Sequence, residues 1–120
     1  MTNKEIVLKF YEEVFNGWDA SKIDDYIAED YKQHTSGVAD GREGFKEFFA
    51  KFVNNHPHMD ICLAVQDDDI VVMYFKVTTD SGIGKVCDIY RVRDGKLCEH
   101  WDVTKPLDPN VVPLNQNGEF

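Results

Sequence analysis

Two acids and a histidine mark the two ends of one predicted hairpin. The stretch 88–102, DIYRVRDGKLCEHWD, opens with Asp88 and closes with His100 and Asp102. A carboxylate can remove a proton from the carbon next to a carbonyl, while an imidazole hydrogen-bonds the developing enolate oxygen. Asp102 could instead only orient His100 or cap a backbone amide. We name Asp88, His100 and Asp102 as the candidate catalytic residues.

The turn within this hairpin decides which side chains share a face, because a slip of one residue moves every side chain to the opposite face. A two-residue loop, Asp94 and Gly95, would put Asp88 on the same face as Trp101. A three-residue loop that also includes Arg93, with Gly95 left-handed, would place Asp88 opposite His100 and Val86 opposite Asp102. The sequence allows both loops.

The chemistry of the two faces favours the three-residue loop. One face then holds Asp88, Tyr90, Cys98, His100 and Asp102, and the other holds Ile89, Arg91, Leu97, Glu99, Trp101 and Val103. On the second face Arg91 and Glu99 can pair diagonally, whereas Leu97 and Trp101 would be apolar and exposed. We therefore predict a homodimer that buries this outer face of the sheet.

Three helices are predicted before any of these strands. Apolar residues recur at helical spacing after a capping box at Thr2–Glu5 and stop at Gly17. A second helix runs from Asp19 to about Ala28, the segment 31–37 forms an extended or looping link, and a third helix runs from Asp40 to Val53. The third helix carries four phenylalanines on one stripe, Phe48 among them.

From Met59 the apolar period changes to two, which predicts strands at 59–66, 70–79, 84–92 and 96–104. The turns between them are short, so the pairing is antiparallel. Helices followed by such strands predict an α+β domain whose curled sheet leaves a cone-shaped space, either filled or open. The domain spans 1–120, with 105–120 as a C-terminal tail.

The composition limits the classes of molecule that this protein is expected to bind. The net charge is -9, and no cluster of Lys and Arg is longer than a pair, which argues against nucleic acid and anionic membranes. No apolar run is long enough to cross a bilayer. Three cysteines without metal-type spacing suit a reducing compartment, so we expect a cytoplasmic protein.

Four motifs together resemble one family. These are DIYRVRDGKLCEHWDV at 88–103, YKQH at 31–34, DGREG at 40–44 and NGEF at 117–120. They are similar to the SnoaL-like polyketide cyclase family, which has the nuclear-transport-factor-2-like fold. The resemblance covers essentially the whole chain. It implies a cone-shaped α+β barrel with three N-terminal helices in the concave face of a mostly antiparallel sheet, a homodimer, and a pocket that needs no cofactor.

Carried over by position, the resemblance implies that His34, Asp88, His100 and Asp102 line the pocket. Without it, His34 would be taken for an exposed loop residue. Aldol-condensing relatives often carry two histidines where this chain has Tyr74 and Lys76.

We add Tyr74, Trp18, Phe48 and Tyr90 as candidate ligand-binding residues. For Tyr74 a core position and for Trp18 a packing role are the alternatives.

Two histidines and two carboxylates could form a facial metal site. No HxH or HExxH spacing supports one, and His56-Pro-His58 lies in a predicted loop, so we predict neither metal nor cofactor.

These observations predict a protein that binds a hydrophobic, carbonyl-bearing small molecule and acts as an aldol-type cyclase, isomerase or hydratase. The alternative is a non-catalytic ligand-binding or dimerisation module of the same fold. An open cavity that receives Asp88, His100 and Asp102 would favour the enzyme, and a cavity filled by aromatic side chains would exclude it.

Overall fold

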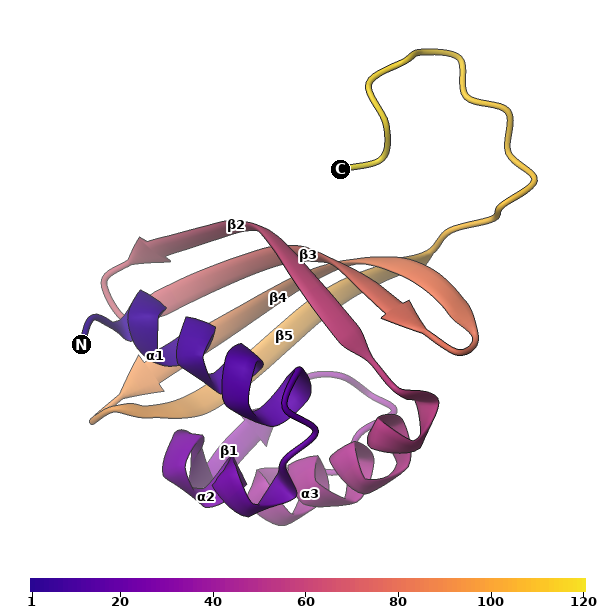
Figure 1. Ribbon diagram of the computed structural model, residues 1–120. Helices are drawn as coiled ribbons and strands as arrows, with labels where there is room; N and C mark the ends of the chain where they lie inside the picture. The colour runs from indigo at the N-terminus through magenta and orange to yellow at the C-terminus, as the bar shows by residue number, and fades with distance from the viewer.

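Helices cover one face of a curled sheet, and the opposite, outer face carries only the C-terminal tail (Figure 1). The computed structural model describes residues 1–120. The helices are α1 Asn3–Phe10, α2 Ile23–Tyr26 and α3 Gly41–Phe52, with a π-helical turn at Tyr11–Phe15 and 3-10 turns at Ala20–Lys22 and Val53–Asn55. The strands are β1 Ile27–Gln33, β2 His58–Asp67, β3 Ile70–Thr79, β4 Gly82–Arg93 and β5 Lys96–Pro106. No helix is long and apolar enough to cross a membrane.

The sheet has five strands in the order β1-β5-β4-β3-β2. Every pair is antiparallel except β1 with β5. The predicted α+β class, with three helices inside a curled and mostly antiparallel sheet, is confirmed. The sheet stays open, with β1 and β2 as its two edges, so the cone is not a closed barrel.

Strand β1 was not predicted, because 27–28 were assigned to a helix and 31–37 to a link. Only Ile27 and Tyr31 are buried along this edge strand. A spacing of four between them imitates a helix, and the polar residues around them give no alternation. The strand forms by pairing in parallel with β5, which sets Gln33 beside His100.

The first helix begins at the predicted capping box, and its last turn is a wider π-helical turn. The Thr2 hydroxyl oxygen accepts the Glu5 N–H at 3.1 Å. After Phe10 the helix becomes π-helical, and the Asn16 N–H donates to the Tyr11 carbonyl at 2.8 Å. The wider turn buries Tyr11 and Phe15 together, so both reach the interior.

The β4–β5 turn has two residues, so the preferred three-residue loop was wrong. Asp94 and Gly95 both have positive φ, 52° and 76°, as a type I′ turn requires. Val92 accordingly pairs with Leu97.

A β-bulge follows this turn and moves the rest of β5 by one residue. Beyond it Tyr90 pairs with His100 and Asp88 with Asp102, so the expected pairing of Asp88 with His100 was also wrong. Cys98 is the inserted residue.

Asp88, Tyr90, His100 and Asp102 all lie on the inner face, as predicted. A two-residue turn followed by a bulge puts them there, in place of the predicted three-residue loop. Leu97, predicted on the outer face, is fully buried in the core. Without the extra residue, Glu99 would follow Leu97 into the apolar interior, and a lone buried carboxylate is costly.

The segment before α3 is fastened to β1. Asp40 does not cap α3 with its side chain, contrary to the capping pattern, and instead accepts the Gln33 N–H at 2.7 Å. This contact closes the loop of residues 35–40, called the 35–40 loop below.

The tail beyond Pro106 has no helix or strand and arches over the outer face (Figure 1). Its end returns to the sheet, where Glu119 meets Lys85 at 2.7 Å and the Phe120 ring packs near Tyr74.

Candidate functional site

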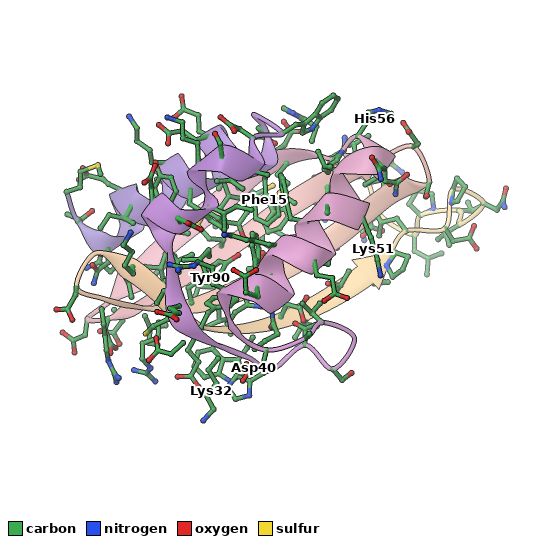
Figure 2. The ribbon with its side chains drawn as sticks, turned by 90° about the horizontal axis from the view of Figure 1, so that it is seen from below. Phe15, Lys32, Asp40, Lys51, His56 and Tyr90 are labelled. Atoms are coloured by element: carbon green, nitrogen blue, oxygen red, sulfur yellow. The ribbon has the colours of Figure 1, made fainter.

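A cavity of about 240 Å³ lies between the helices and the sheet, and 11 of its 17 lining residues are hydrophobic. Phe45, Phe48 and Phe52 of α3 form one wall. The facing wall carries the polar side chains of β4 and β5. Figure 2 shows Phe15 and Tyr90 in the layer between helices and sheet. The aromatic side chains line this space and leave it open, which removes the condition that would have excluded an enzyme.

Asp88 is buried on β4 and is held by three side chains. Its Oδ2 accepts the Tyr11 hydroxyl and lies 3.2 Å from the Tyr90 hydroxyl, which is also 2.8 Å from that of Tyr11. Its Oδ1 lies 3.0 Å from Nε2 of His100. Burial, followed by the nearby Asp88 charge, raises the pKa of Tyr11 and Tyr90 well above that of a free phenol. Both tyrosines therefore stay protonated and act as donors.

His100 is fixed at both ring nitrogens. Nδ1 lies 2.7 Å from Oε1 of Gln33, and the same oxygen accepts the Thr35 N–H at 3.0 Å, which sets the orientation of the amide. Nδ1 must then carry hydrogen, because Oε1 can only accept. Nε2 lies 3.0 Å from Oδ1 of Asp88, so both ring nitrogens are engaged by protein groups.

Asp102 differs from Asp88 in having one side-chain hydrogen-bond partner in place of three. Its Oδ1 accepts the Thr35 hydroxyl at 2.8 Å, and no protein group occupies Oδ2. The side chain is half-buried and lines the cavity. Asp102 is therefore the carboxylate in this cavity with an oxygen free to accept a proton.

Tyr31 supplies a free donor beside that carboxylate. Its side chain lines the cavity and is 1% exposed, yet its hydroxyl makes no hydrogen bond with the chain. Nε of Arg42 is the only fully buried side-chain nitrogen or oxygen without a hydrogen-bond partner. The Tyr31 hydroxyl, which also has no partner, is therefore not fully buried and faces the cavity. Burial, followed by the charges of Asp88 and Asp102, raises its pKa well above the usual value. The amide nitrogen of Gln33 is a second unused donor in the lining.

Of the eight predicted site residues, Asp88, Tyr90, His100, Asp102 and Phe48 line the cavity. Three do not, which corrects the expectation that they contact a ligand there.

His34 lies at the end of β1 on the outer side, stacked on Trp101 at 4.8 Å and 2.7 Å from Glu99. It turns outward because it follows Gln33, whose side chain faces inward to His100.

Tyr74 lies on the outer face of β3, where its hydroxyl donates to the Glu119 carbonyl at 3.2 Å. Lys76, two residues on, shares this face and lies near the Phe120 ring. Trp18 is 48% exposed at the end of the π-helical turn, and its indole N–H donates to the Pro57 carbonyl at 2.7 Å. It packs against His56 and does not reach the cavity.

Sequence reasoning missed four polar side chains of the site: Tyr11, Tyr31, Gln33 and Thr35. Tyr31 and Gln33 belong to the unpredicted strand β1, and Thr35 follows it. Tyr11 looked like one more apolar position of the first helix. A buried Asp88 does demand donors, and that requirement was the available signal.

Asp88, His100 and Asp102 could together approach a cation, since one donor atom of each lies within 4.8 Å of the others. However, Nε2 of His100 already faces Asp88, and Oδ2 of Asp88 already receives the tyrosine hydroxyls. A metal would have to replace these hydrogen bonds. The predicted independence from metal and cofactor stays a prediction.

The open, curled sheet with helices inside it and a pocket in the cone defines a protein of the nuclear-transport-factor-2-like class. Residues 5–108 match the family described as SnoaL-like polyketide cyclase. The chain belongs to that family.

Solved structures show the same fold. A proposed polyketide cyclase from Acidithiobacillus ferrooxidans has 22% identity and a TM-score of 0.74, over 86% of this chain and 88% of the other. IdmH, a proposed polyketide cyclase from Streptomyces antibioticus, has 22% identity and a TM-score of 0.75, over 87% and 92%. An NTF2-like protein of unknown function from Cytophaga hutchinsonii has 13% identity and a TM-score of 0.75, over 88% and 92%. The comparison with curated proteins gave no match.

Proposed function

We propose that this protein binds a small, hydrophobic carbonyl compound in the inner cavity and catalyses an aldol-type cyclisation without a cofactor. One observation carries the proposal: a carboxylate with a free oxygen, Asp102, lines an apolar cavity together with the unpartnered hydroxyl of Tyr31. Membership of the SnoaL-like family supports the same reaction class.

Asp102 is the general base in this mechanism. It removes a proton from the carbon next to a carbonyl, and the electrons of the broken C–H bond move onto the carbonyl oxygen. Tyr31 donates a hydrogen bond to that enolate oxygen. The enolate carbon then attacks a second carbonyl of the same molecule, and the new alkoxide takes the proton back from Asp102. Protons and electrons balance without an external oxidant or reductant.

Asp88 and His100 position the polar wall and do not exchange protons with the substrate. Both nitrogens of His100 and both oxygens of Asp88 already face protein groups. Asp102, in contrast, keeps its Oδ2 free of protein groups.

The test uses 2,6-heptanedione, a small diketone that can close a six-membered ring by intramolecular aldol reaction. Deuterium uptake next to its carbonyls and ring formation are both followed by proton NMR. We expect Asp102→Asn to slow both processes by about 100-fold or more, the usual range for a lost general base. Asp30→Asn, which changes an exposed acid of β1, is the matched control.

The same experiment separates the enzyme from a non-catalytic binding module. A binding module would show diketone-induced chemical shifts at the cavity while deuterium uptake stays at the solution rate. If both rates are the same in Asp102→Asn as in the unchanged protein, Asp102 is not the base.

The outer face of the sheet is the proposed contact of a homodimer. Leu63, Val65 and Val103 lie on it with 60%, 56% and 72% of their surface exposed. Trp101 lies between His34 and Arg91 on the same face. Light scattering at low protein concentration should give twice the mass of the chain, and Val103→Asp should halve it. A monomeric unchanged protein would overturn this proposal.

Cytoplasmic residence remains part of the proposal. Its support is that Cys62, Cys87 and Cys98 are all free.

A further inference from the structure

A second hollow adjoins the inner cavity on the outer side of α3. It has a volume of about 320 Å³ and lies between α3 and the 35–40 loop. Val38, Phe48 and Phe52 line both spaces. These three side chains therefore form the border shared by the inner cavity and this outer cleft.

This shared border consists of apolar side chains, and the backbone that carries them is held by hydrogen bonds and packing. The Phe48 and Phe52 rings stack with their centroids 5.1 Å apart, one turn apart on α3. Val38 belongs to a loop that is closed at both ends, since its N–H donates to the Thr35 carbonyl at 3.0 Å and Asp40 accepts the Gln33 N–H.

The loop also rests directly on the helix. A Cβ at Gly44 would lie 1.9 Å from the carbonyl oxygen of Ala39, so only glycine allows this approach. The cleft is therefore built by backbone packing and does not depend on a mobile lid.

The two compartments differ in chemistry. The inner cavity is mainly aromatic and aliphatic apart from its polar wall. The outer cleft includes Glu47, Lys51 and Asn55 among its nine lining residues, only four of which are hydrophobic. In Figure 2, Lys51 projects from α3 on the side where the 35–40 loop lies. A molecule that occupies both spaces would be apolar where it passes Phe48 and Phe52 and polar at its outer end.

Size leads to the same conclusion. Pockets that enclose a drug-sized ligand measure roughly 300–1,000 Å³, so the inner cavity alone suits only a small reacting head. A longer substrate must place its remainder elsewhere, and the outer cleft is the adjoining space.

We propose that the outer cleft is a second substrate subsite, which takes the far end of an elongated carbonyl compound whose reacting head lies in the inner cavity. This inference rests on the proposed function. It assigns the selection of chain length to Val38, Phe48 and Phe52. It also makes the substrate a keto compound with a polar terminus.

Gly37 offers a clean way to block the subsite. It lines the outer cleft and not the inner cavity, and a Cβ added there meets no atom within 4 Å. Its φ is not in the left-handed region, so a larger residue causes no backbone strain. Gly37→Leu should fill the cleft, and Gly37→Ala is the matched control for loss of glycine.

The probes are alkane-2,6-diones that lengthen at one end from 2,6-heptanedione and carry a hydroxyl group at that end, to match the polar lining of the outer cleft. Binding is measured by NMR titration of the whole chain. In the unchanged protein and in Gly37→Ala, affinity should rise about fourfold for each added methylene, past the length that fills the inner cavity. In Gly37→Leu, affinity should stop rising at that length, while 2,6-heptanedione binds as before. The Gly37 and Gly44 amide signals should move with the long probes only.

Two results would overturn the inference. One is an equal rise of affinity with length in Gly37→Leu and Gly37→Ala. The other is a rise that stops at the same length in the unchanged protein. Failure of the proposed function looks different, because 2,6-heptanedione would then show no Asp102-dependent deuterium uptake in any variant.

Discussion

Nε2 of His100 lies 3.0 Å from Oδ1 of Asp88, whereas Asp102, two residues along β5 from His100, meets only a hydroxyl at its Oδ1. The two acids of the cavity therefore differ in what they can do. Both oxygens of Asp88 are engaged by protein groups. Asp102 keeps an oxygen free, which is why the proposed base is Asp102 and not Asp88.

Asp88→Asn should lower the free energy of unfolding by about 3 kcal/mol, because it breaks a buried pair and leaves His100 and two tyrosine hydroxyls without a carboxylate acceptor. Asp102→Asn should cost less than about 1 kcal/mol, since only the Thr35 hydroxyl loses a partner. Urea unfolding of both variants, with Asp30→Asn as the exposed control, measures the difference. A larger loss in Asp102→Asn than in Asp88→Asn would reverse the assigned roles.

Tyr31→Phe should change the free energy of unfolding by less than about 1 kcal/mol, because the hydroxyl has no protein partner to lose. It should reduce turnover of 2,6-heptanedione by about 100-fold to 1,000-fold, the effect of losing one donor to an oxyanion. The comparison is with Tyr74→Phe, whose hydroxyl lies on the outer face. Equal activity in the two variants would argue against Tyr31 as the enolate donor.

Stability should fall as pH rises above about 10, the ordinary pKa of a tyrosine. The pKa values of Tyr11, Tyr31 and Tyr90 are raised in the folded protein, chiefly by burial. Above that pH the unfolded chain loses these protons while the folded chain keeps them, so each tyrosine lowers the free energy of unfolding by about 1.4 kcal/mol per pH unit. Below about pH 9 these groups contribute no pH dependence.

Urea unfolding between pH 8 and pH 11, as chosen conditions, measures this slope. Tyr26 adds to this slope, because burial, followed by Glu13, raises its pKa as well. Tyr31→Phe removes one of these four tyrosines and should make the slope shallower by about 1.4 kcal/mol per pH unit. Absorbance of tyrosinate below the unfolding pH in Tyr74→Phe, which removes the outer-face tyrosine, would show that the buried tyrosines ionise in the folded state and would contradict the expectation.

The two-residue turn can be tested at Asp94, which has φ of 52°. Asp94→Gly should be neutral or slightly stabilising, because glycine adopts this conformation freely. Asp94→Val should cost about 1–2 kcal/mol, because a β-branched residue is strained there. Arg93→Val is the control, since Arg93 belongs to strand β4, where valine is well tolerated. A three-residue loop would instead make Arg93 the more sensitive position.

The sequence by itself determined the elements whose patterns are local. Alternation of apolar residues defined β2 to β5, helical spacing defined α1 and α3, and the motif at 88–103 pointed to the family. Alternation also placed Asp88 and Tyr90 on one face of β4, and the same period placed His100 and Asp102 together on β5, because a period of two needs no distant partner to be read.

Only the tertiary structure decided what surrounds those four side chains. Tyr31 and Gln33 reach the site because β1 pairs in parallel with β5, and an edge strand with few apolar residues has no signal of its own. Tyr11 meets Asp88, which lies 77 residues further along the chain. Leu97 enters the core because the β4–β5 turn has two residues, and the bulge at Cys98 then returns His100 to the inner face. Each of these features lowers the free energy through contacts between segments far apart in the chain, and local periodicity carries no record of such contacts.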